Sequence, residues 1–214
     1  MTTLPLASVY THALQGHPCT VWEGDLAPQR LPTHAWLARA GAADLALLAH
    51  CQGPTIDIGC GPGRMSEALA EAGHAVLGID VVPEAVRQTR TRGVAALRRS
   101  VFDRVPGEGR WETALLADGN IGIGGDPVAL LERAAELAAP DGRVVVDIAP
   151  WGHGVVTRHV RLETSHGRSG QFPWTTVGAD AIQAVAHAAG LGRATEHRYA
   201  DRWWAVVEAR SCGR

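Results

Sequence analysis

The stretch of residues 55–64 constrains the fold of this chain more than any other. A short, mainly β-branched run at 55–58 ends in three alternating glycines, Gly59, Gly61 and Gly63, and a helical pattern begins directly after them. Glycines let backbone N–H groups approach a ligand that a Cβ atom would keep away. The N-terminus of a helix adds a positive dipole end. We therefore expect a strand, a tight turn and a helix N-terminus that together bind a nucleotide-like ligand.

Alternating strand and helix patterns follow this turn. The predicted further strands are 75–79, 94–97, 111–117, 143–148, 191–197 and 203–209. The predicted helices are 64–72, 83–92, 128–139 and 179–189. This order predicts an α/β fold: a Rossmann-like, doubly wound, mostly parallel sheet of about seven strands, with an antiparallel last strand and helices on both faces. Residues 149–177 are rich in Trp, His and Arg and are expected to be irregular, although His159 alternates with Val160 and Leu162 and could face outward on a strand.

Residues 1–50 precede the glycine turn and are expected to form a helical extension of a single domain whose main part is 51–214. Four prolines break this segment, and helical patterns cover 7–14 and the region from residue 33 to about 51. The extension is expected either to form a lid over the site or to cover a sheet edge, and the sequence favours neither.

Composition excludes several classes of function. All the basic residues are arginine, so lysine-dependent chemistry is excluded. The net charge of −2 gives no excess of positive charge that would attract a nucleic acid. Cys19, Cys51, Cys60 and Cys212 have the spacing of neither a disulfide framework nor a zinc site, so we expect no metal. Without a signal peptide or a long apolar run, the chain is expected to be soluble, cytoplasmic and without a membrane partner.

Two carboxylates narrow the expected ligand. Asp80 ends the second strand, 17 residues after Gly63, where a carboxylate binds ribose hydroxyls in doubly wound folds. Asp57 precedes the first glycine by two residues, where it would repel a pyrophosphate and attract an α-amino group. The glycine spacing also differs from that of dinucleotide sites. A nicotinamide-dependent oxidoreductase is therefore the less favoured interpretation.

The residues DIGCGPGR at 57–64 resemble the first motif of the class I S-adenosylmethionine-dependent methyltransferases, and LGID at 77–80 resembles their second. The resemblance covers roughly residues 53–210, and DGNIGIGGDP at 118–127 is similar to a stretch of small actinobacterial methyltransferases. It implies S-adenosylmethionine as cofactor, S-adenosylhomocysteine as product, and in-line methyl transfer to a small molecule, with secondary metabolism as the suggested context. A non-catalytic S-adenosylmethionine-binding protein is a further alternative.

The resemblance also implies which residues contact the cofactor. The glycine turn would line the methionine and ribose, Asp57 would hold the amino group, and Asp80 would bind the ribose hydroxyls. Side chains after the second and third strands would flank the adenine, and the segment after the fourth strand would face the methyl group. The full set is Asp57, Gly59, Cys60, Gly61, Gly63, Asp80, Val81, Val101, Phe102, Asp118, Gly119 and Asn120.

Candidates for catalysis and substrate binding lie near the carboxyl ends of the strands, where ligands bind in such folds. His153 is a candidate general base, ahead of His159 and His166, and Asn120 is a second catalytic candidate.

Two sets of side chains after the fifth strand have both a functional and a structural interpretation. Three aromatic residues could form a wall for a planar substrate or pack against their own loop: Trp151, Phe172 and Trp174. Three arginines could clamp an anion or form a solvated face: Arg158, Arg161 and Arg168.

The loop after the fourth strand lacks the Asn/Asp-Pro-Pro-aromatic run typical of enzymes that methylate DNA adenine or glutamine, and this argues against both substrates. A metal-dependent catechol-type methyltransferase is also disfavoured, because no metal-ligand spacing is present. The acceptor atom and the oligomeric state are not determined by the sequence.

Overall fold

The computed structural model describes residues 2–24 and 27–209, and it contains two sheets. The larger has seven strands in the order β12-β13-β8-β7-β4-β5-β6. Its strands are β4 (Thr55–Ile58), β5 (Val76–Asp80), β6 (Ala95–Arg98), β7 (Trp111–Leu116), β8 (Ala138–Ile148), β12 (Ala194–Tyr199) and β13 (Arg202–Glu208). The last strand, β13, runs antiparallel to both its neighbours, and the central strands are parallel. The predicted doubly wound sheet is therefore confirmed.

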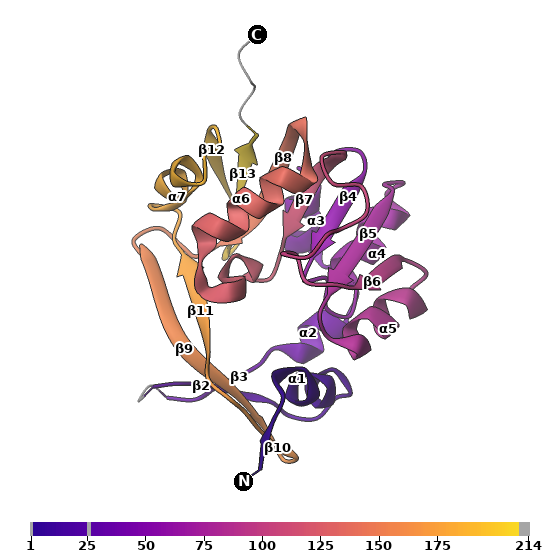
Figure 1. The fold of residues 1–214 in the computed structure, drawn as a ribbon, viewed down its shortest axis with the longest axis vertical. Coiled ribbons are helices and arrows are strands. Elements are labelled where there is room, and N and C mark those ends of the chain that lie inside the picture. The colour runs from indigo at the N-terminus through magenta and orange to yellow at the C-terminus, as the bar shows by residue number, and fades with distance from the viewer. Residues whose placement is uncertain (1, 25–26, 210–214) are drawn as a thin grey trace.

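Helices cover both faces of this sheet (Figure 1). On one face α3 (Ala42–Leu48) and α4 (Arg64–Glu71) pack against β7, β8 and β13. On the other face α6 (Pro127–Leu137) and α7 (Ile182–Ala188) complete the largest apolar core. Apolar side chains alternate between the two cores along β7 and β8, because successive side chains of a strand point to opposite faces. None of the described helices is long and apolar enough to cross a lipid bilayer.

A second sheet corrects two expectations. It contains β1 (Thr3–Leu4), β2 (Thr20–Glu23), β3 (Gln29–Arg30), β9 (Val155–Thr164), β10 (Gly167–Ser169) and β11 (Phe172–Val177). Most of residues 149–177 is thus regular rather than irregular, and the N-terminal extension contributes strands as well as helices. The sequence pattern was insufficient because β9 pairs with β2, a partner more than a hundred residues away.

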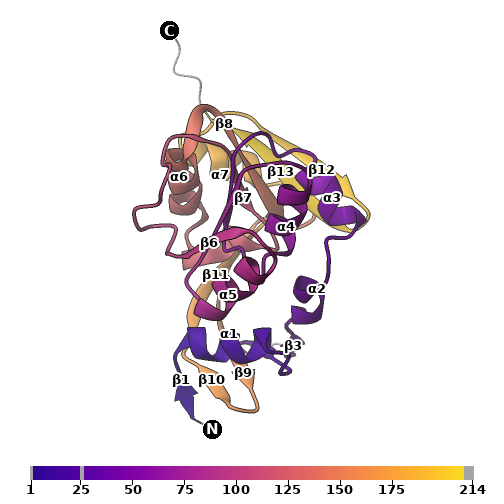
Figure 2. The ribbon, with the colours of Figure 1, turned by 90° about the vertical axis from the view of Figure 1, so that its right-hand side faces the viewer.

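The N-terminal helices place this segment beside the main domain. Helix α1 (Leu6–Leu14) packs Val9 and Ala13 against Leu162 of the second sheet, and Leu14 against Val82 and Ala85 next to β5. Both views show α1 between the second sheet and α5 (Pro83–Thr91) (Figures 1 and 2). The short α2 (Thr33–Leu37) then leads back to α3. The N-terminal segment therefore borders the carboxyl end of β5.

Candidate functional site

The glycine turn connects β4 to α4 as predicted, and its three glycines all have positive φ: 71° at Gly59, 54° at Gly61 and 86° at Gly63. A Cβ at Gly63 would lie 2.8 Å from the Cα of Thr89, whereas a Cβ at Gly61 would meet nothing within 4 Å. Gly63 therefore allows α5 to pack closely against the turn. Gly61 leaves free space above it.

Cys60 is the side chain inside this turn, and it faces the protein rather than the free space. A Cβ at Gly78 would lie 2.8 Å from its Sγ atom, so β5 approaches it closely. Burial raises the pKa of the Cys60 thiol well above its ordinary value, and the nearby Asp57 raises it further. The buried thiol is thus a packing group and not a nucleophile.

The two predicted carboxylates have different surroundings. Asp80 accepts hydrogen bonds from the Gly61 N–H (3.0 Å) and the Val82 N–H (2.8 Å), which joins the end of β5 to the turn. Asp57 is only 1% exposed, and its Oδ2 accepts a hydrogen bond of 2.5 Å from Ser66 Oγ. Burial raises the pKa of Asp57 to about 7, although the Ser66 bond opposes this shift. Asp80 lies at the surface of the turn and Asp57 beneath it.

The three residues predicted to flank an adenine differ in their exposure. Val81 and Phe102 are 53% and 50% exposed, which is unusual for large apolar side chains unless they face a ligand or partner. Val101 is buried in the main core instead, and its expected contact with an adenine is not supported. Phe102 lies near η1 (Asn120–Gly125), since a Cβ at Gly124 would be 3.5 Å from its ring.

The segment after β7 is fastened to the glycine turn. Asp118 and Gly119 have φ angles of 53° and 79°, so the chain makes a sharp turn there. The Asn120 Nδ2 group donates to the carbonyl oxygens of Ile58 (2.8 Å) and Gly59 (2.9 Å). Asn120 is therefore brought to the site, with its amide nitrogen holding the turn.

A buried ion-pair network around Asp118 was missed by sequence reasoning. Arg64 donates to both Asp118 carboxylate oxygens, at 2.7 and 2.6 Å, and also pairs with Asp44 of α3. Arg202 of β13 pairs with Asp44, with Asp118 at 3.2 Å, and with Asp147 at 3.0 Å through its Nε. Asp147 in turn accepts from the Asp118 N–H at 2.6 Å. The position of Arg64 directly after the glycine motif was the only signal available.

Tyr10 of α1 is a second residue that the sequence did not reveal. Its ring lies 6.1 Å from that of Trp36 and packs beside Val82 and Ala85. Burial raises the pKa of Tyr10, and the negative charges of Asp80 and Asp118 raise it further. Tyr10 thus packs where the N-terminal segment meets the start of α5, directly after Asp80.

The second sheet presents one face toward η1. Its register places Glu23, Arg158, Phe172 and Trp174 on the same face, because paired residues share a side. The Arg158 guanidinium lies 2.6 Å from the Glu23 carboxylate, and the Phe172 and Trp174 rings meet edge to face at 6.3 Å. A Cβ at Gly122 would be 2.6 Å from the Trp174 ring, so Trp174 borders η1.

Several predicted substrate residues are not brought together. Trp151 is 68% exposed and forms no ring contact with the other described aromatic residues, so it does not complete a wall with Trp174. Exposed His153 contacts Thr176 Oγ1 at 3.0 Å through its Nε2. His159 is exposed on β9, and His166 stacks on His12 at 4.3 Å between ring centres.

The three arginines that could have clamped an anion do not lie together. Arg158 pairs with Glu23 on one face of the second sheet, whereas Arg161 points to the opposite face and stacks over Trp22. The third arginine, Arg168, lies on the separate strand β10. An anion could not be held by all three, because alternate residues of a strand point to opposite sides.

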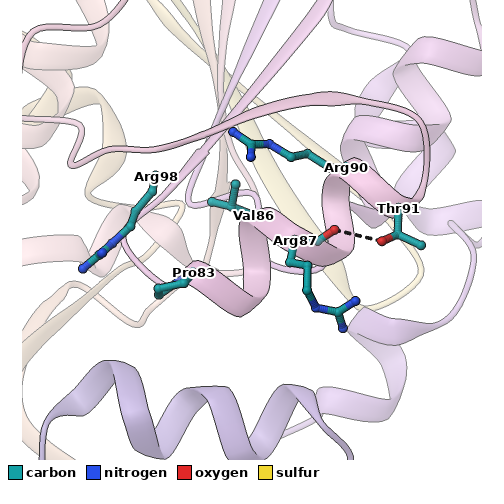
Figure 3. A pocket seen from close by; sticks show the side chains of 6 residues that line it. All are labelled: Pro83, Val86, Arg87, Arg90, Thr91 and Arg98. Atoms are coloured by element: carbon teal, nitrogen blue, oxygen red, sulfur yellow. Dashed lines mark hydrogen bonds between the residues drawn. The ribbon is translucent and has the colours of Figure 1, made fainter.

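A cavity of about 440 Å³ lies beside α5 and β6, outside the glycine turn (Figure 3). Its arginines already have partners: Arg87 pairs with Glu84, Arg90 donates to the Ala96 carbonyl, and Arg98 donates to the Val81 carbonyl. None of its lining residues belongs to the predicted site. We assign it no ligand.

Comparisons with known proteins agree with this geometry. Residues 56–142 match the family model described as a methyltransferase domain. A ubiquinone biosynthesis O-methyltransferase of Xylella fastidiosa is 31% identical over 97 residues, which are 42% of this chain and 39% of the relative. The chain thus matches only about two fifths of the length of that relative.

Solved structures extend the likeness to almost the whole chain. A methyltransferase of Bacteroides fragilis, crystallised with S-adenosylhomocysteine, has a TM-score of 0.80 at 19% identity and covers 97% of this chain and 98% of its own. The 1,6-didemethyltoxoflavin-N1-methyltransferase of Burkholderia thailandensis has a TM-score of 0.59 at 20% identity and covers 98% and 91%. The fold expected from the resemblance is confirmed: the chain has the fold of S-adenosylmethionine-dependent methyltransferases, and residues 56–142 match a methyltransferase domain.

Proposed function

We propose that this protein transfers a methyl group from S-adenosylmethionine to a small-molecule acceptor. The observation that carries the proposal is the pair of hydrogen bonds that the Gly61 and Val82 N–H groups donate to the Asp80 carboxylate. They join a glycine turn and a strand-end carboxylate into one site, with free space above Gly61. A ribose above Gly61 would find the carboxylate at its hydroxyls, and exposed Val81 and Phe102 would flank the base.

The remaining predicted cofactor residues have supporting roles in this proposal. Gly59 and Gly63 shape the turn, and Asp57 beneath it would attract the amino group in its deprotonated form. Asp118, Gly119 and Asn120 form the wall at the methionine end. The N-terminal segment acts as a cover, because Tyr10 and Leu14 of α1 pack against Val82 and Ala85, directly after Asp80.

The acceptor would bind between η1 and the second sheet. Trp174 and Phe172 offer an apolar surface there, and the Glu23–Arg158 pair offers charged groups on the same face. When bound, the cofactor supplies an electrophilic methyl group. The chain's own contribution is to align the acceptor with that group, since correct alignment can lower the barrier by several kcal/mol. His153, held by Thr176, is the proposed base for acceptors that must lose a proton.

The proposed partner is a small molecule rather than a nucleic acid, because a net charge of −2 gives the protein no overall electrostatic attraction for phosphates. The proposed compartment is the cytoplasm, for which three buried free cysteines, Cys19, Cys51 and Cys60, give support. Cys212 lies outside the described residues.

Calorimetry with S-adenosylhomocysteine tests this proposal. We expect binding in the micromolar range or tighter, and a loss of about tenfold or more in Asp80→Ala, equivalent to one lost charge-assisted hydrogen bond. Asp141→Ala, at an exposed position in β8, is the matched control and should bind normally. Binding of NADH instead of S-adenosylhomocysteine would replace the proposal by the oxidoreductase alternative.

A further inference from the structure

The ion-pair network around Asp118 links the N-terminal segment to the cofactor site. Asp44 and Asp118 each bridge the same two arginines, Arg64 and Arg202, so the four side chains form a closed ring of alternating charge. The ring draws on α3, the start of α4, the loop after β7 and the start of β13. Asp44 is its only contribution from residues 1–50.

The charges of this network do not balance. With Asp147, three carboxylates share two guanidinium groups, which leaves a formal charge of −1. Asp118 is the most exposed member, with 28% of its side chain accessible against 7–17% for the others. The excess negative charge is therefore presented to the outside through Asp118.

The network also holds Asp118 in an uncommon conformation. A φ of 53° is unfavourable for a residue with a Cβ. Three contacts compensate: Asp147 accepts the Asp118 N–H at 2.6 Å, and Arg64 binds both carboxylate oxygens. Asp44 in turn fixes both guanidinium groups, and Arg64 lowers the pKa of Asp44 despite the opposing effect of burial.

We propose that Asp44, Arg64 and Arg202 are positioning residues that present the Asp118 carboxylate to the amino group of the cofactor's methionine end. The N-terminal segment then completes the cofactor site through Asp44, rather than only covering it. This inference rests on the proposed function. It predicts that removing the charge of Asp44 weakens the binding of ligands that carry the amino-acid end and leaves the binding of ligands without it unchanged.

The test compares two ligands on Asp44→Asn. S-adenosylhomocysteine carries the amino-acid end, whereas 5′-methylthioadenosine keeps the adenosine and sulfur but lacks the amino group. We expect Asp44→Asn to weaken S-adenosylhomocysteine binding roughly tenfold, as for one lost charge-assisted interaction, and to leave 5′-methylthioadenosine binding unchanged. Asp44→Glu restores the charge and should recover most of the affinity.

Glu71→Gln is the matched control. The Arg39–Glu71 pair also joins the N-terminal segment to α4, but both side chains are largely exposed, and both affinities should be unchanged. Equal weakening of both ligands in Asp44→Asn, or of neither, overturns the inference. If Asp44→Asn does not fold, Arg202→Lys is measured in the same way, because a lysine cannot bridge three carboxylates, and the same selective loss is required. Failure of the unaltered protein to bind S-adenosylhomocysteine would instead overturn the proposed function.

Discussion

Single residues of the glycine turn show how burial changes their chemistry. Asp57 has an ordinary position in the motif, but its carboxylate lies beneath the turn with Ser66 Oγ as its hydrogen-bond donor. Burial is the largest cause of its raised pKa of about 7, and the nearby Asp118 and Asp80 charges add to it. Its charge therefore changes near neutral pH, at a place where an amino group is proposed to bind.

This shift predicts a pH dependence of stability. The pKa of Asp57 rises from 3.8 in the unfolded chain to about 7 in the folded one, so between these values only the folded protein keeps the proton. The stability contributed by Asp57 is then present at low pH and falls as pH rises through this window. The Asp57→Asn variant has no titratable group at this position, so its stability should lack this pH dependence.

Urea unfolding of both proteins at pH 5 and pH 8 measures this difference. The unaltered protein should lose a few kcal/mol relative to Asp57→Asn between the two pH values, because one pKa unit corresponds to about 1.4 kcal/mol. If the unfolding free energies of the two proteins changed in parallel with pH, the buried carboxyl at position 57 would not have a raised pKa.

Gly63 gives a second prediction at this scale. Gly63 and Gly73 have φ angles of 86° and 90°, but only a Cβ at Gly63 would collide, at 2.8 Å from the Thr89 Cα. Gly73→Ala should cost about 1–2 kcal/mol for backbone strain alone. Gly63→Ala should cost clearly more and should weaken S-adenosylhomocysteine binding. Equal unfolding midpoints in denaturant would refute the steric argument.

At the scale of elements, local signals explain how well helix α6 was anticipated. Asp126 caps the helix by accepting from the Val128 and Ala129 N–H groups at 3.1 and 3.0 Å, and Pro127 takes the first helical position. Both residues act within their own neighbourhood, which is why the sequence alone predicts where this helix begins.

The same contacts predict the effect of removing the cap. Asp126→Ala should lower the free energy of unfolding by about 1 kcal/mol, because two N–H groups lose their acceptor. Asp126→Asn keeps an acceptor oxygen and should retain most of the stability. Chemical denaturation of the three proteins measures this, and identical losses for the two variants would show that the charge and not the cap matters.

At the scale of the whole molecule, a group of histidines joins α1 to the second sheet. The ring of His166, in the turn between β9 and β10, lies 4.3 Å from that of His12 and 4.5 Å from that of His17. The pKa of His12 is lowered by burial and by its two histidine neighbours. No group of three or more His, Cys, Asp or Glu residues in the described ranges has a metal-binding arrangement.

Acid should therefore destabilise the junction between α1 and the second sheet. The folded pKa of His12 lies below its ordinary value of 6.5, so protonation favours the unfolded state as pH falls below about 6.5. His12→Phe should reduce the drop in melting temperature between pH 7.5 and pH 5.5. His187→Phe, on the exposed side of α7, serves as control. An unchanged drop in His12→Phe would exclude this contribution.

The sequence by itself determined the main sheet, the glycine turn and the place of Asp80, because strand alternation, helix caps and glycine turns are set by neighbouring residues. Only the tertiary structure decided the second sheet, the position of Tyr10 and the network around Asp118. Their partners are far apart in the chain: Asp44 and Arg202 are separated by 158 positions, and β1 at Thr3–Leu4 pairs with β10 at Gly167–Ser169. Local sequence patterns do not identify such pairs, because each partner on its own resembles any other charged residue or any other residue of a strand.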